Sequence, residues 1–174
     1  DLYNNEEIMK INFIIPMTHH TGGIQVIFTY AEYFYRKGHD VVCYYPNIAY
    51  ETNSFWSRFK STVGNFVKDR KNISFMDISF MIKGIALINN YNIRNADVTI
   101  ATSYQTAYDV EKLSLQKGQK FYFIQDYEIW FNKKKCEQSY YLNLKKIVIA
   151  NWLNKLLVEH YDCPPSPVIY NGIN

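Results

Sequence analysis

Short runs of apolar, β-branched or aromatic residues recur along the chain, and most of them are followed by a segment of helical length and periodicity. Because these runs lack in-and-out alternation, they are typical of strands covered on both faces, as in parallel sheets. The order of the elements predicts an α/β fold with a doubly wound, mainly parallel sheet and right-handed crossovers. The predicted strands are residues 11–15, 41–45, 98–101, 121–124, 147–150 and 168–170.

Three of the intervening segments carry the end signals of helices as well as their period. Gly38 is expected at the C′ position of the first helix, Ser103 at the N-cap of the second, and Asn151 at the N-cap of the third. Two prolines, Pro164 and Pro165, stop the third helix. The predicted helices are residues 24–37, 103–116 and 151–161.

The stretch 47–95 interrupts this alternation. Its apolar pattern predicts a helix over 53–70, a short strand at 73–76 and a helix at 83–90. Residues 53–71 hold five basic residues and one acidic residue, a local net charge of +4 that exceeds the +3 of the whole chain. This helix either packs on the sheet with its lysines in solvent or lies on an anionic membrane. The membrane-facing candidates are Trp56, Arg58, Lys60, Lys68, Arg70 and Lys71.

The composition narrows the class of protein. With 174 residues, 48% of them hydrophobic and 20% charged, the chain is expected to form one globular domain whose core needs no disulfide or metal. A net charge of +3 is too small to indicate nucleic-acid binding. The three cysteines form no CxxC pair, and residues 1–10 lack the apolar centre of a signal peptide. We therefore expect a cytoplasmic protein in a reducing compartment.

The loop 16–23, with the sequence Pro-Met-Thr-His-His-Thr-Gly-Gly, joins the first predicted strand to the first predicted helix. Open α/β sheets bind ligands at this carboxyl edge, and free amides at the start of a helix attract phosphate. Thr21, Gly22 and Gly23 are therefore candidate phosphate-binding residues. The alternative is a tight turn that needs glycine for its backbone angles. The loop matches neither the dinucleotide-binding fingerprint nor a Walker loop, which disfavours a dehydrogenase.

A second polar cluster, Gln125, Asp126 and Glu128, follows the predicted strand 121–124 and precedes two aromatic residues. Amide and carboxylate groups of this kind bind hydroxyl-rich ligands through hydrogen bonds, while an aromatic face can cover a sugar ring. The alternative is that Asp126 caps the following segment and the aromatic residues pack in the core.

Ser103 and Tyr104 close the preceding strand in the same way, with simple helix capping as the alternative. His19 and His20 are adjacent, and neighbouring side chains of an extended loop diverge, so no metal site is predicted; one of them is expected to face the cleft. The sequence contains no nucleophile elbow, no Cys/His dyad at a legible spacing and no hydrolase-type carboxylate pair. A hydrolase that works through a covalent enzyme intermediate is therefore disfavoured.

Six segments with characteristic residues follow one another at 9–11, 21–23, 36–41, 96–103, 148–153 and 168–174. In this order they resemble the N-terminal, acceptor-side domain of glycosyltransferase family 4, in which the last segment usually reads Asn-Gly-Ile-Asp where this chain has Asn-Gly-Ile-Asn. The segment 121–131 is most similar to the subgroup of bacterial polysaccharide rhamnosyltransferases. The resemblance covers residues 9–174 and leaves residues 1–8 as a natural or added N-terminal extension.

The resemblance implies a GT-B fold, two Rossmann-like lobes with the reaction between them. It implies retaining transfer of a sugar from a nucleotide-sugar to a hydroxyl of a glycan or lipid-linked acceptor, with no metal or cofactor, in surface-polysaccharide synthesis on the inner face of the plasma membrane. Gly22 and Gly23 would approach the donor diphosphate. Gln125 stands where many members carry a histidine near the donor sugar, and it forms the candidate catalytic pair with Asp126. The acceptor side would be lined by His20, Ser103, Tyr104 and Glu128.

In that family the nucleotide-sugar lobe begins where this sequence ends. We therefore expect residues 9–174 to be one lobe of a longer enzyme, inactive by itself. The alternative is a non-catalytic Rossmann-like module that docks on membranes or protein partners through the basic helix predicted at 53–70.

Overall fold

A computed structural model describes residues 7–47, 50 and 76–171. In this part of the chain the strands form one six-stranded sheet in the order β3-β2-β1-β4-β5-β6, and all neighbouring strands run parallel. The strands are β1 (Lys10–Ile14), β2 (Asp40–Pro46), β3 (Met81–Ile85), β4 (Val98–Ala101), β5 (Gln119–Ile124) and β6 (Lys145–Val148). The helices are α1 (Gly22–Arg36), α3 (Tyr104–Glu111), the 3₁₀ helix η1 (Leu115–Lys117), α4 (Ile129–Ser139) and α5 (Asn151–Tyr161).

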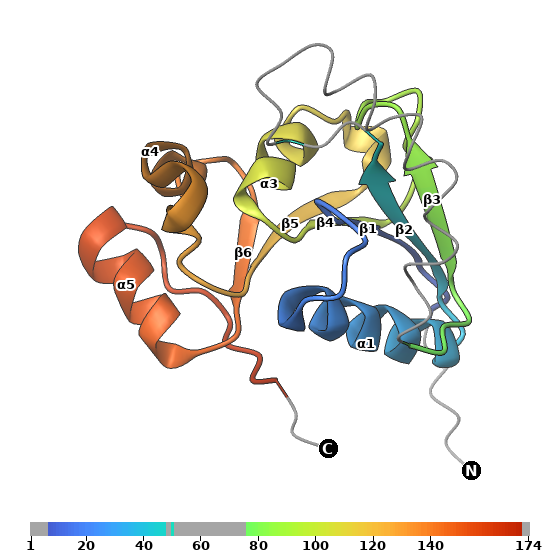
Figure 1. The fold of residues 1–174 in the computed structure, drawn as a ribbon, viewed down its shortest axis with the longest axis horizontal. Coiled ribbons are helices and arrows are strands. Elements are labelled where there is room, and N and C mark those ends of the chain that lie inside the picture. Colours follow the sequence, from blue (N-terminus) through green and yellow to red (C-terminus); the bar gives the residue numbers. More distant parts are fainter. Residues whose placement is uncertain (1–6, 48–49, 51–75, 172–174) are drawn as a thin grey trace.

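The sheet is covered on both faces, as a doubly wound, Rossmann-like fold requires. Helix α1 packs on one face and α3 on the other (Figure 1). The core on the α1 face centres on Ile27, Phe28 and Phe13. The core on the opposite face joins α3, α4 and α5 to the sheet. The prediction of a doubly wound parallel sheet is therefore confirmed.

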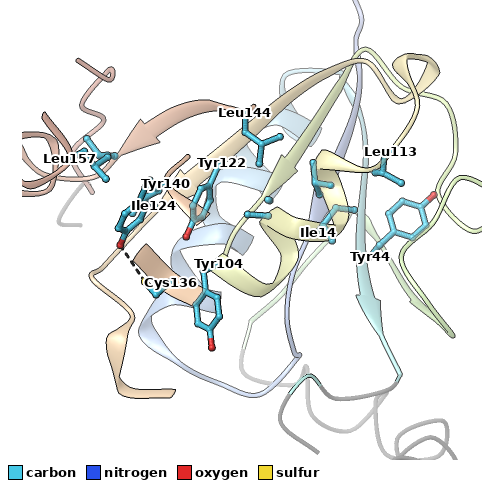
Figure 2. Packing of buried hydrophobic residues seen from close by; sticks show 14 of the residues in the cluster. Ile14, Tyr44, Tyr104, Leu113, Tyr122, Ile124, Cys136, Tyr140, Leu144 and Leu157 are labelled. Atoms are coloured by element: carbon cyan, nitrogen blue, oxygen red, sulfur yellow. Dashed lines mark hydrogen bonds between the residues drawn. The ribbon is translucent and has the colours of Figure 1, made fainter. Parts of the chain in front are cut away.

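Buried tyrosines are prominent in the core beneath α3, α4 and α5 (Figure 2). The hydroxyl of Tyr140 is 3.3 Å from the Cys136 sulfur, and the Ser139 hydroxyl donates to that of Tyr122 at 3.5 Å. A buried phenol needs a partner for its hydroxyl, and these contacts supply it. The three cysteines are buried and unbridged, so they pack as small apolar side chains.

Most of the predicted elements lie within a few residues of their expected positions. Ser103 is the N-cap of α3, as predicted, but this helix ends at Glu111 and η1 follows it. Gly38 adopts a φ of +93° just beyond α1, the left-handed conformation expected of a C′ glycine. The prediction of Asn151 as N-cap of α5 is wrong: Asn151 is the first residue of the helix, and the N-cap is Ala150, whose side chain has no atom that can accept a hydrogen bond.

One strand prediction and one helix prediction, both at the margins of the sheet, are wrong. The segment 168–170 forms no strand; Val168 makes only an isolated parallel bridge with Val148. The helix predicted at 83–90 is replaced by β3, which pairs with β2 along its whole length. Gly84, a poor helix former, allows this pairing because a Cβ there would lie 2.5 Å from the Tyr45 hydroxyl oxygen.

The remaining predictions for the stretch 47–95 fall mainly outside the described residues. The helix predicted at 53–70 lies there entirely. Of the strand predicted at 73–76, only Met76 is described, and it lies in a bend.

One buried carboxylate ties α1 to the segment that leads into β3. Glu32 accepts a hydrogen bond from the Ser79 amide at 2.8 Å and another from Arg36 Nε at 2.7 Å. These bonds, the Ser79 amide first, lower the pKa of Glu32 below its ordinary value of 4.5. The charged form of Glu32 is therefore part of the folded state.

Replacing Glu32 by alanine removes both bonds and leaves the Ser79 amide without its acceptor, so the free energy of unfolding should fall by about 1–3 kcal/mol. Because the native pKa is lowered, the contribution of Glu32 is present above pH 4.5 and is lost as the pH falls through the lower native value. Urea unfolding followed by circular dichroism, at about pH 7 and about pH 3, measures both effects.

Glu159→Ala is the matched control, because Glu159 on α5 is exposed and its contact with Lys155, at 3.7 Å, is a solvent-screened pair. It should change the free energy of unfolding by less than about 0.5 kcal/mol. Equal stability of Glu32→Ala and Glu159→Ala would show that Glu32 anchors nothing.

Candidate functional site

A cleft of about 480 Å³ opens at the carboxyl edge of the sheet. Pro16, Thr102, Gln125 and Ile149 line it, and each follows the end of a different strand: β1, β4, β5 and β6. Strands β1 and β4 are neighbours, whereas α1 and α3, which follow them, cover opposite faces (Figure 1). The cleft therefore lies at the topological switch point, the usual ligand site of an open α/β sheet.

The two glycines of the first loop form one wall of this cleft, at the start of α1. Thr21 is the N-cap, and its hydroxyl oxygen accepts a hydrogen bond from the Ile24 amide at 3.2 Å. Among the described residues, the amides of Gly22 and Gly23 have no acceptor. Two N–H groups and the positive end of the helix dipole therefore remain for an anion.

Backbone conformation does not explain the two glycines. Gly22 and Gly23 are both helical, and the described glycines with positive φ are Gly38 and Gly118. This excludes a turn that needs glycine for its dihedral angles. A Cβ at Gly22 would meet nothing within 4 Å, so the missing side chain leaves open space above the helix start.

Gln125 faces the glycine wall. A Cβ built on Gly23 would lie 3.5 Å from Gln125 Nε2, an ordinary van der Waals distance. The first polar side chain after β5 therefore lies beside the amides of α1. The amide group of Gln125 can donate to a ligand that those amides also contact.

Asp126 lines the cleft and is exposed. Its Oδ1 accepts a hydrogen bond from the Tyr127 amide at 2.7 Å. Helix α4 begins at Ile129, and its N-cap position is Glu128, so Asp126 does not cap that helix. Its second carboxylate oxygen has no hydrogen-bond partner among the described residues, which leaves it available to a ligand.

Glu128 is a partly buried carboxyl group of the cleft whose pKa is raised by its surroundings. Its Oε2 accepts a hydrogen bond from the Tyr104 amide, at the first turn of α3, at 3.1 Å. Burial raises the pKa of Glu128 to about 7, the bond from Tyr104 opposes this rise, and the nearby charge of Asp126 adds to it. At neutral pH this carboxyl group is thus able to accept or donate a proton.

Tyr127 holds this short segment in place from the opposite side. Its hydroxyl is 2.8 Å from Glu137 Oε1 on α4 and 2.7 Å from the hydroxyl of Tyr161 on α5. The Tyr161 hydroxyl also donates to Glu137 Oε1, at 2.9 Å. This triangle fixes Tyr127, so that Asp126 and Glu128 on either side of it face the cleft.

The aromatic residues at the start of α4 do not pack in the core. Trp130 and Phe131 are 62% and 57% exposed and line the mouth of the cleft. Their packing was the alternative to a binding role for this segment, and their exposure removes it. A ligand ring could lie against either face.

The other predicted site residues lie apart from this cleft. Ser103 is buried, and its hydroxyl forms a capping box with Thr106 at the start of α3. Tyr104 lines a second hollow between α3 and α4. His20 is exposed and is not among the residues lining either cavity. Their part in acceptor binding stays a prediction.

Sequence reasoning missed Thr102 and Ile149 as cleft residues. The Thr102 hydroxyl donates to the Ile14 carbonyl at 2.9 Å, which joins the ends of β4 and β1 under the cleft. Its position directly after a predicted strand was the available signal.

Two further findings concern the described part of the chain. It contains no group of three or more His, Cys, Asp or Glu side chains placed to hold a metal ion. No helix described here has the length and apolarity needed to cross a bilayer. The six membrane-facing candidates between 56 and 71 lie outside the described residues, so the membrane-docking alternative stays a prediction.

The raised pKa of Glu128 predicts a measurable titration and a pH-dependent stability. Because the native state holds this proton more tightly than the unfolded chain, whose value is 4.5, stability should fall as the pH rises from 4.5 to about 7. Carbon-13 NMR of the glutamate carboxyl groups should show one group titrating near pH 7. Glu128→Gln should remove that signal and unfold at a higher temperature than the wild type above pH 7.

Asp126→Asn provides the second arm, because loss of its negative charge should lower the pKa of Glu128 while burial continues to raise it. A Glu128 carboxyl group that titrates near 4.5 in the wild type would contradict the site described here.

Comparison with protein-family models, with curated proteins and with solved structures finds no match for this chain.

Proposed function

We propose that this chain is the acceptor-binding lobe of a retaining glycosyltransferase, which transfers a sugar from a nucleotide-sugar to a hydroxyl of a glycan or lipid-linked acceptor. The observation that carries the proposal is one cleft that combines uncapped amides at a helix start with an amide and two carboxyl side chains. The ordered segments that resemble glycosyltransferase family 4 support the same assignment.

The amides of Gly22 and Gly23 serve the donor side. When the bond between the sugar and the diphosphate breaks, negative charge grows on the leaving phosphate oxygens. Donors that are already oriented by α1 stabilise this charge without reorganising. The side-chain amide of Gln125, next to Gly23, adds a neutral donor toward the sugar or the departing oxygen.

The carboxyl groups serve the acceptor side. Asp126 and Glu128 accept hydrogen bonds from hydroxyl groups of the acceptor, while the exposed faces of Trp130 and Phe131 cover its ring. In retaining transfer of this kind the proton of the attacking hydroxyl passes to the leaving phosphate. Glu128, with a pKa of about 7, can be neutral beside that anion and so avoids repelling it.

The rest of the donor is held elsewhere in this proposal. None of the described residues that line the cleft is Lys or Arg. A second, nucleotide-binding lobe would supply the cations that a diphosphate requires, as the family resemblance implies. The same proposal places the transfer reaction at the inner face of the plasma membrane, on a lipid-linked acceptor.

Gly23→Val should abolish sugar transfer while the fold is retained. The new methyl groups would enter the cleft beside Gln125 and cover the helix amides, whereas the Cβ itself has room. The test uses the polypeptide that the complete gene encodes, with a panel of UDP-, GDP- and dTDP-sugars. Release of nucleoside diphosphate in the presence of acceptor should fall by at least about a hundredfold, the usual loss when oxyanion-type donors are removed.

Gln25→Ala is the control, because Gln25 is exposed in the first turn of α1 and does not line the cleft. It should keep wild-type turnover. Full turnover of a folded Gly23→Val variant would refute the role of the amides, and a wild-type protein inactive with every donor would refute the function.

A further inference from the structure

A second cavity, which we call the α3–α4 hollow, lies between helices α3 and α4 and measures about 590 Å³. Gln105 and Tyr108 of α3 and its C-cap residue Lys112 line one wall, and three residues of α4 line the other: Phe131, Lys135 and Gln138. All six side chains are at least partly exposed. No role in the proposed reaction accounts for this cavity.

The uncharged residues that line the hollow are of the kinds that bind carbohydrates. Sugar rings bind to proteins through aromatic faces that cover C–H groups and through planar amides that pair with hydroxyl groups. Tyr108 and Phe131 supply the aromatic faces, and Gln105 and Gln138 supply the amides. Tyr108 is held in place because its hydroxyl donates to the Lys135 carbonyl at 2.8 Å.

The charged groups of the hollow favour an anion. Lys112 and Lys135 stand on opposite walls, both exposed, and neither forms an ion pair with any described residue. The acidic lining residue, Asp109, accepts a hydrogen bond from the Tyr50 hydroxyl at 2.6 Å, which occupies one of its oxygens. The described residues that line the hollow thus carry two ammonium groups and one carboxylate, a net positive charge.

The hollow and the cleft adjoin each other. Phe131 lines both cavities, so this residue is shared between them. The Glu128 carboxyl group, which borders the cleft, is bonded to the amide of Tyr104, whose side chain lines the hollow. A chain of sugars can therefore pass from the cleft over Phe131 into the hollow.

We propose that the α3–α4 hollow is a second sugar subsite that binds an acidic residue of the acceptor, so that the acceptor is an anionic oligosaccharide carrying a carboxylate or a phosphate. The inference rests on the proposed function, because it takes the sugar in the cleft to be the acceptor's reacting end. The subsite sets the specificity for the residue behind that end.

The test measures binding to the full chain without turnover, by nitrogen-15 NMR titration. A hyaluronan tetrasaccharide, which carries glucuronate, should bind about five- to twentyfold more tightly than neutral chitotetraose, the range expected for two exposed ion pairs. Added salt should reduce this preference. Glucuronate and glucose 6-phosphate, each compared with glucose, show which anionic group the two lysines prefer.

The double variant Lys112→Ala/Lys135→Ala should lose the preference for the acidic tetrasaccharide. Lys134→Ala is the matched control, since Lys134 is exposed on α4 and lines neither cavity, and it should keep the preference. Equal binding of the two tetrasaccharides, binding of neither, or an unchanged preference in the double variant overturns the subsite. Sugar transfer that persists in that case leaves the proposed function standing, whereas acidic-glycan binding without any transfer overturns the enzyme alone.

Discussion

The cleft exists because the segments that follow two neighbouring parallel strands lead to opposite faces of the sheet. Strands β1 and β4 lie side by side, and the hydrogen bond from the Thr102 hydroxyl to the Ile14 carbonyl joins them at their ends. From there α1 turns to one face of the sheet and α3 to the other (Figure 1). The cleft opens between these two departing segments, at the carboxyl edge of the sheet.

The electrostatics of the cleft follow from this geometry. On one side, α1 presents backbone amides and the positive end of its dipole. On the other, Glu128 is partly buried against the first turn of α3 and accepts one hydrogen bond there from the described residues, too little to offset the loss of solvent, so its charged form is disfavoured. In the function we propose, the cleft binds the charged diphosphate of the donor beside Glu128, a carboxyl group that is able to stay neutral near pH 7 and so does not repel it.

Much of the fold could be predicted from the sequence because strands covered on both faces are apolar throughout, and helix ends carry cap residues. The prediction failed at two places: where a strand is held by pairing with a distant strand, and where a helix is interrupted by a non-helical residue. Strand β3 is held by β2, a partner more than 30 residues away in sequence. The residue pattern of 83–90 alone does not indicate this pairing. Helix α4 was missed because Asn132, with φ −150° and ψ 91°, interrupts it after one turn and hides its period.

The candidate site was predictable in outline for a similar reason. Gln125, Asp126 and Glu128 follow a buried strand, and strand ends of a parallel sheet share one edge. Which of these side chains face the cleft could not be predicted, because capping bonds and contacts between distant residues decide it. The hydroxyl of Ser103 turns inward to the start of α3, and that of Tyr127 turns to Glu137 on α4.

The capping of α1 by Thr21 has a stoichiometric consequence for any phosphorylated ligand. Because its hydroxyl accepts from the Ile24 amide, Thr21 leaves Gly22 and Gly23 as the residues of the first turn of α1 whose amides have no acceptor in the described part of the chain. Two such donors match two oxygens of a single phosphoryl group. A second phosphoryl group would find no Lys or Arg among the described residues that line the cleft, so its charge would stay unneutralised on this wall.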